Sequence, residues 1–149
     1  MKYSDLAKDR TSDYVFAWDR ALAMDGNTAP YLQYAHARIC SIFRRAEIDR
    51  DSVRRVKPAI VQPQERVLAL RLLGFDAAVW STVDTWSPHR LSGYLYELAQ
   101  DFTAFYEACP VLRAEDEMTR TSRLALCDLT ARILERGLDL LGIRAPERM

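Results

Sequence analysis

The chain has 149 residues, 49% hydrophobic and 28% charged, with a formal net charge of zero at pH 7. This length and composition suffice for one domain with a buried core and exclude a disordered polypeptide, while the neutral charge argues against a general nucleic-acid coat. No apolar run approaches the roughly 18 residues of a membrane helix and residues 1–10 lack a signal peptide's apolar centre, so we expect a cytoplasmic protein.

The first predicted helix covers the sequence YVFAWDRALAM, residues 14–24. Thr11, Ser12 or Asp13 could cap its N-terminus, and the pair at 25–26, Asp-Gly, is typical of a helix end. The segment is amphipathic but short, so we expect an appendage to the main domain.

The second predicted helix begins at Asn27 or Thr28 as the cap, with Pro30 tolerated in the first turn. At 100° per residue one arc of this helix is apolar. It contains Leu32, Ala35, Ile39, Ile42, Phe43 and Ala46. A separate arc, here named the aromatic-basic strip, contains Tyr31, Tyr34, Arg38, Ser41 and Arg45. Tyr31 borders the apolar arc, so it could equally be a core residue. His36 lies on the other edge of the apolar arc, and we assign it no function.

Residues 47–65 form a charged segment with two prolines, which predicts an extended loop. A helix is expected from Pro63 to Leu73, ended by Gly74. Asp76 could cap a further short helix over residues 77–86.

A long helix should follow Ser87 and Pro88 and end before Pro110. Its apolar spacing predicts core packing and no cofactor site. The residues concerned are Leu91, Leu95, Leu98, Phe102, Phe105 and Tyr106.

The last predicted helix runs from Met118 to Leu141 and is apolar over most of its circumference. One narrow charged face carries Asp128, Arg132, Glu135, Arg136 and Asp139, with an attractive i,i+4 pair at 128 and 132. So wide an apolar surface places this helix near the centre of an all-α helical bundle. Residues 143–149 would either fray or lie against the bundle and extend a binding surface.

Basic residues gather in two regions. Residues 38–57 carry seven basic and three acidic side chains, and residues 119–149 carry six and four. These regions could make a localised contact with phosphates, or they could be a solvated loop and a solvated helix face.

The cysteines and histidines show no spacing typical of a metal site. Cys40, Cys109 and Cys127 are best interpreted as reduced, partly buried thiols. His36 and His89 leave little material for acid–base chemistry near neutral pH, so nothing in the chain requires an enzyme.

Three long runs resemble arginyl-tRNA synthetase, a class I enzyme, at the junction between its catalytic domain and its C-terminal anticodon-binding domain of the DALR type. They are KYSDLAKDRTSDYVFAWDRALAMDGNTAPYLQYAHARICSIFRRA, HRLSGYLYELAQDFTAFYEACPVL and TSRLALCDLTARILERGLDLLGIRAPERM. The resemblance implies that residues 1–25 are the edge of the catalytic, stem-contacting region and that residues 26–149 are an α-helical anticodon-binding domain.

This resemblance implies recognition of the anticodon loop of the arginine tRNA. The matching motifs make Tyr31, Tyr34, Arg38 and Met149 the expected anticodon contacts, because unstacked bases can stack on tyrosine rings or an arginine plane. The phosphate candidates are Arg44, Arg45, Arg54, Arg55 and Lys57, each of which could also be a solvated charge.

The catalytic signatures of class I synthetases, the HIGH-like and KMSKS-like motifs, are absent, as is any Gly-rich phosphate loop. We therefore expect no catalytic residue, cofactor or metal in this chain, whereas ATP and Mg²⁺ belong to the full enzyme. The expected partners are the arginine tRNA and the catalytic domain, with no membrane or DNA partner. Apolar residues Tyr14, Phe16 and Trp18 could face that catalytic domain.

Two interpretations remain open at this point. The chain is either the C-terminal part of a complete arginyl-tRNA synthetase or a free-standing relative that acts as a tRNA-binding or protein-interaction bundle.

Overall fold

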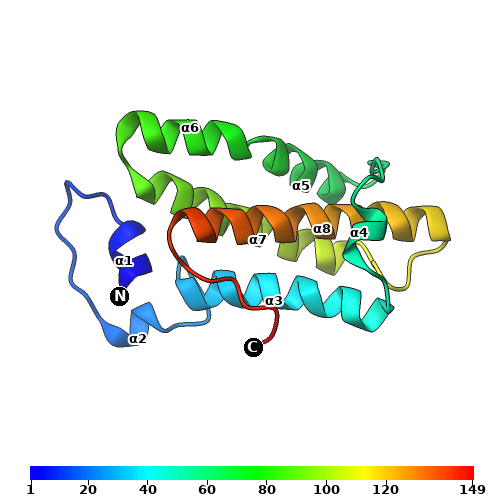
Figure 1. Ribbon diagram of the computed structural model, residues 1–149, viewed down its shortest axis with the longest axis horizontal. Helices are drawn as coiled ribbons and strands as arrows, with labels where there is room; N and C mark the ends of the chain where they lie inside the picture. The colour runs from blue at the N-terminus through cyan, green and yellow to red at the C-terminus, as the bar shows by residue number, and fades with distance from the viewer.

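The computed structural model describes residues 1–149, and its regular elements are all α-helices (Figure 1). The helices are α1 (Lys2–Leu6), α2 (Trp18–Ala21), α3 (Ala29–Ala46), α4 (Arg50–Val53), α5 (Pro63–Leu73), α6 (Phe75–Thr85), α7 (Pro88–Ala108) and α8 (Glu117–Leu140). The predicted all-α bundle is confirmed. No helix has the length and apolar character needed to cross a membrane.

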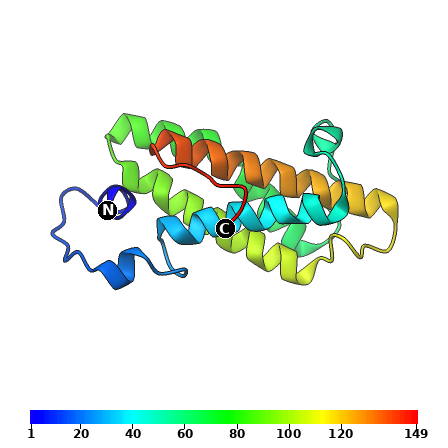
Figure 2. The same ribbon diagram turned by 60° about the horizontal axis from the view of Figure 1, so that its bottom comes forward.

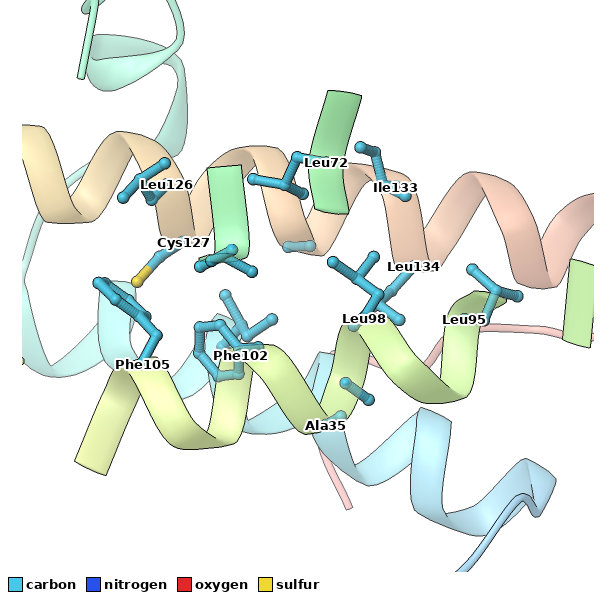
Figure 3. Packing of buried hydrophobic residues seen from close by; sticks show 14 of the residues in the cluster. Ala35, Leu72, Leu95, Leu98, Phe102, Phe105, Leu126, Cys127, Ile133 and Leu134 are labelled. Atoms are coloured by element: carbon cyan, nitrogen blue, oxygen red, sulfur yellow. The ribbon is translucent and has the colours of Figure 1, made fainter. Parts of the chain in front are cut away.

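Helices α7 and α8 form the middle of the bundle, with α3 along one side and α5 and α6 along the other (Figures 1 and 2). Figure 3 shows Leu98 and Phe102 of α7 pointing towards Cys127 and Leu134 of α8. These side chains are at most 1% exposed, and they belong to one cluster of 27 buried hydrophobic residues. The predicted central position of the last helix is therefore confirmed.

The starts of the long helices follow their caps. The Thr28 hydroxyl accepts a hydrogen bond from the Tyr31 N–H at 3.2 Å, and Pro30 occupies the first turn of α3. Helix α8 begins one residue earlier than predicted, because Asp116 caps it by accepting the Thr119 N–H at 2.8 Å. Ser87 precedes α7 as expected, but its hydroxyl donates to the Thr85 carbonyl instead of capping the helix.

The predicted helix over residues 14–24 is wrong except for the single turn α2, and residues 13–17 have no regular secondary structure. No residue of α2 is buried. A short helix is unstable in water unless its apolar face packs on a partner, and α2 is not packed extensively on any other helix. The structure instead forms α1, which was not predicted and which buries Tyr3.

The loop predicted over residues 47–65 is interrupted by α4. Asp49 caps this helix by accepting the Asp51 N–H at 3.1 Å, and Val53 is buried against the bundle. Helix α6 begins at Phe75, so Asp76 lies in its first turn and does not cap it.

The charged face predicted on α8 is also partly wrong, because Asp128 is completely buried. Its two carboxylate oxygens accept from Arg50 of α4 and from Arg132, each at 2.9 Å. The predicted attraction between residues 128 and 132 is confirmed. Arg50 of α4 covers the Asp128 carboxylate. The sequence pattern predicts a surface charge at this position, but α4 buries it in an ion cluster.

A second buried carboxylate, Glu65, joins α5 to α8. It accepts from the Arg123 side chain at 2.8 Å and from the backbone N–H groups of Val61 and Gln62. Burial opposes ionisation, but these hydrogen bonds outweigh it and hold the pKa of Glu65 below its usual value.

Candidate nucleic-acid interface

The aromatic-basic strip of α3 faces outwards along most of its length. Tyr34 is 44% exposed, Arg38 is half-buried and Arg45 is exposed. The neighbouring apolar arc is buried as predicted except for half-buried Ala46, and Leu32 and Ile39 are fully inaccessible. The helix therefore anchors itself by one face and presents the strip on another.

Arg38 is held by an aromatic platform on α7. Its guanidinium carbon lies 4.9 Å from the centre of the Tyr106 ring. Tyr106 is itself stacked on buried Phe102, with the ring centres 6.0 Å apart and the planes at 25°. This cation–π contact holds the guanidinium over the Tyr106 ring.

Tyr31 lies at the base of the strip and is half-buried. Its ring packs edge-on against Tyr96 of α7, with the centres 5.6 Å apart. It also contacts the hydrophobic core. The structure thus gives Tyr31 a packing role and leaves only part of its ring open to solvent.

The C-terminal tail, residues 143–149, does not fray. Gly142 ends α8 with a positive φ of 68°, and the chain then turns back and ends beside α3 (Figure 2). Three side chains of α3 bind tail carbonyls: Gln33 donates to residue 144 at 2.7 Å, His36 to 146 at 2.9 Å and Arg44 to 147 at 2.9 Å. The tail therefore lies against the bundle, as one of the two possibilities for it predicted.

The tail brings Met149 to the aromatic-basic strip, where it borders an open hollow of about 320 Å³. The hollow is lined by Tyr34, Ala37, Arg38, Ser41, Arg44, Arg45, Tyr106 and Met149. Three of these residues are arginines, and none is an aspartate or a glutamate. The surface therefore combines exposed aromatic and thioether groups with concentrated positive charge, which suits a stacked base beside a phosphate.

The structure separates the predicted phosphate contacts into two groups. Arg44 and Arg45 line the hollow. Arg54, Arg55 and Lys57 are exposed in the segment around α4, which packs on α8, and none of them lines the hollow. Arg54 also forms an ion pair with Asp51 at 2.8 Å.

Sequence reasoning did not find three residues that build this surface. The apolar spacing of α7 predicts that Tyr106 is a core residue, but Tyr106 is half-buried and its ring supports Arg38. Gln33 and His36 were given no function, yet they hold the tail. Only the position of His36 beside the apolar arc indicated burial, and no sequence pattern paired it with residue 146.

The remaining reactive side chains form no obvious site. The three cysteines are buried and unpaired, and burial raises the pKa of the Cys40 thiol. No group of three or more histidine, cysteine, aspartate or glutamate residues is placed to hold a metal ion.

Comparisons with known proteins agree with this geometry. The chain is 51% identical to the arginine–tRNA ligase of Proteus mirabilis and 56% identical to that of Thermobifida fusca. Both alignments cover 100% of this chain and 26% of the relative, so the chain spans about a quarter of these proteins.

Solved structures give the same result. The arginyl-tRNA synthetases of Thermus thermophilus and Plasmodium falciparum superpose with a TM-score of 0.89 each, at 39% and 35% sequence identity. Each match covers 99% of this chain and 26% of the solved chain. The family profile that matches residues 32–149 is that of the DALR anticodon binding domain. The chain belongs to this family of anticodon-binding domains.

Proposed function

We propose that this chain is the anticodon-binding module of an arginyl-tRNA synthetase and that it binds the anticodon loop of the arginine tRNA. The observation that carries the proposal is the hollow on α3 where Tyr34, Arg38 and Met149 meet, which contains three arginines and no aspartate or glutamate. Three parts of the chain that are far apart in sequence converge there, namely α3, α7 and the tail.

Tyr34 and Arg38 are the principal base contacts in this proposal. An unpaired loop base can stack on the exposed Tyr34 ring, and the Arg38 plane is already oriented by Tyr106. Met149 is 65% exposed and offers a polarizable apolar surface on the other side of the hollow. Tyr31 contributes at the margin, because Tyr96 covers part of its ring.

Phosphates are held by arginine side chains. Arg44 and Arg45 lie in the hollow and can bind the phosphates that flank a stacked base. Arg54, Arg55 and Lys57 form a separate basic segment that would attract the RNA from a distance.

The greater length of the relatives supports a larger enzyme around this module. We infer that residues 26–149 are the anticodon-binding domain and that residues 1–25 adjoin a catalytic domain, which ligates arginine to the tRNA with ATP and Mg²⁺. Exposed apolar side chains support such a contact: Val15 is 87% exposed and Trp18 is 59% exposed. This chain alone would be noncatalytic.

The alternative is a free-standing bundle that uses the same surface to bind RNA without preference or to bind a protein. Such a bundle would also offer a protein partner Trp80 of α6 and Trp86 at the C-cap of that helix, which are each more than 70% exposed and lie outside the hollow. The proposed function requires a higher affinity for the arginine anticodon loop than for other RNA, whereas the alternative does not.

Fluorescence anisotropy with labelled anticodon stem–loops tests the proposal. The arginine stem–loop should bind more tightly than an unrelated stem–loop of equal length, with an affinity that falls as salt rises. Equal affinity for the two RNAs would support the alternative and contradict the proposal.

Matched variants locate the surface. Tyr34→Ala should weaken binding roughly 5- to 150-fold, corresponding to the loss of one base–aromatic stack, whereas Tyr34→Phe should retain most of the affinity. Arg38→Ala should also weaken binding. Arg66→Ala is its control, because it removes the same charge from an exposed position on α5, and α5 packs on α6, α7 and α8.

A further inference from the structure

The tail is held by side chains that share one face of α3. At 100° per residue, positions 33, 36 and 44 fall within an arc of about 80°. Gln33, His36 and Arg44 each donate to a backbone carbonyl of the tail, at residues 144, 146 and 147. We name these three residues the tail clamp. Because the clamp binds backbone carbonyls, it can hold the path of the tail independently of the side chains that the tail carries.

His36 is the buried member of the clamp, with 1% of its surface exposed. The Pro146 carbonyl can only accept a hydrogen bond, so the ring nitrogen Nδ1 must carry the proton. The Cys40 sulfur lies 3.8 Å from Nε2 and 3.9 Å from Nδ1, so it packs against the imidazole and is not directed at one nitrogen. Burial raises the pKa of the Cys40 thiol, so this neighbour stays uncharged. The tail carbonyl and the packing around the buried ring together hold Nδ1 towards the tail.

Arg44 connects the clamp to the hollow. One of its terminal nitrogens donates to the Glu147 carbonyl, and the side chain also lines the hollow. A guanidinium has five N–H groups, so the same arginine can hold the tail and still donate to a phosphate. The contact with residue 147 lies only two residues before Met149.

From these contacts we propose that Gln33, His36 and Arg44 are positioning residues, which hold the tail before RNA arrives so that Met149 completes the binding hollow. The inference rests on the function proposed above. Ordering the tail in the free protein removes an entropic cost that RNA binding would otherwise carry. The affinity for the anticodon loop therefore depends on buried His36, which does not line the hollow.

Methyl NMR of the full chain labelled in methionine tests the clamp without RNA. The Met149 methyl signal, assigned from a Met149→Leu variant, should be shifted by the Tyr34 and Tyr106 rings in the parent. His36→Leu, which keeps the volume but loses the donor, should sharpen this signal and move it to the position of a mobile methionine. His36→Asn should keep the parent signal, because its amide nitrogen replaces Nδ1.

RNA titrations then separate positioning from a merely structural role. His36→Leu should weaken binding of the arginine anticodon stem–loop about 5- to 10-fold, and His36→Asn should restore it. In a chain ending at Gly142, His36→Leu should cause no further loss, because the tail it positions is gone. Gln33→Ala, at a less buried position, should give a smaller loss with unchanged helicity by circular dichroism.

Three results would overturn the inference. The first is a mobile Met149 methyl in the parent, and the second is an unchanged Met149 signal in His36→Leu. The third is an equal loss of affinity from His36→Leu in the full and shortened chains, which would make His36 a core residue only. A parent that binds no RNA would refute the proposed function and the positioning role, while the NMR result would still decide whether the clamp holds the tail.

Discussion

Replacing Gly137 by alanine tests the packing of the two central helices. Gly137 lies inside α8, where an added Cβ would come within 2.4 Å of one methyl carbon of Leu95 and 3.1 Å of its Cγ. Carbon atoms prefer separations of about 3.5–4.0 Å, so the Leu95 side chain would have to move by roughly 1 Å. Leu95 is fully buried between α7 and α8 and has nowhere to move without disturbing the core.

Gly93 is the matched control, because it lies inside α7 and an added Cβ would meet no atom within 4 Å. Alanine in a helix interior is favoured over glycine by about 0.8–1 kcal/mol, so Gly93→Ala should raise the free energy of unfolding by about that amount. Overpacking costs about 1–3 kcal/mol. Gly137→Ala should therefore lower the free energy of unfolding by up to about 2 kcal/mol, opposite in sign to the control.

Urea unfolding followed by circular dichroism measures both variants. In a Leu95→Ala background the clash is removed. Gly137→Ala should therefore lower the free energy of unfolding much less there than in the parent. A Gly137→Ala protein as stable as the Gly93→Ala protein would refute the packing of α7 on α8 described here.

The remaining predictions concern the buried carboxylates and the arginine platform. The lowered pKa of Glu65 means that its contribution to stability is present above the unfolded-state pKa of about 4.3 and is lost as pH falls through the folded-state value. Measured by urea unfolding from pH 7 to pH 3, the free energy of unfolding should therefore fall more steeply for the parent than for Glu65→Gln. Equal slopes of this free energy against pH would contradict the prediction. Asp128→Asn should lower the free energy of unfolding by about 1–3 kcal/mol, whereas Glu135→Gln, at an exposed position of the same helix, should change it little. Tyr106→Leu should weaken RNA binding about 2- to 5-fold and Tyr106→Phe much less, because the phenylalanine ring still supports Arg38; equal losses would show that the ring is not needed.

The long helices could be predicted because their apolar residues repeat at helical spacing and their caps are local. Thr28 directly precedes α3, and Pro30 lies in its first turn. The failure at residues 14–24 has the opposite cause. That segment has helical periodicity, but helix formation there needs a packing partner, and Trp18 remains exposed.

The site could be predicted only in part. Helical periodicity places Tyr34 and Arg38 on a face separate from the core. The resemblance to the synthetase family is the basis for predicting Met149 as a contact. The contacts that assemble the hollow join residues more than 60 positions apart, as Arg38 and Tyr106 do. His36 and Pro146 meet through a backbone carbonyl, which leaves no trace in the pattern of side chains.

The central claim is that the hollow formed by α3, α7 and the tail binds the anticodon loop. The most direct test is to titrate the methionine-labelled protein with the arginine anticodon stem–loop and follow Met149 and Met118. Met118 is 76% exposed at the start of α8 and does not line the hollow, so it serves as the internal reference. The Met149 signal should shift and saturate at the affinity measured by anisotropy while Met118 stays unchanged. A saturable shift of Met118 with no change at Met149 would contradict the account.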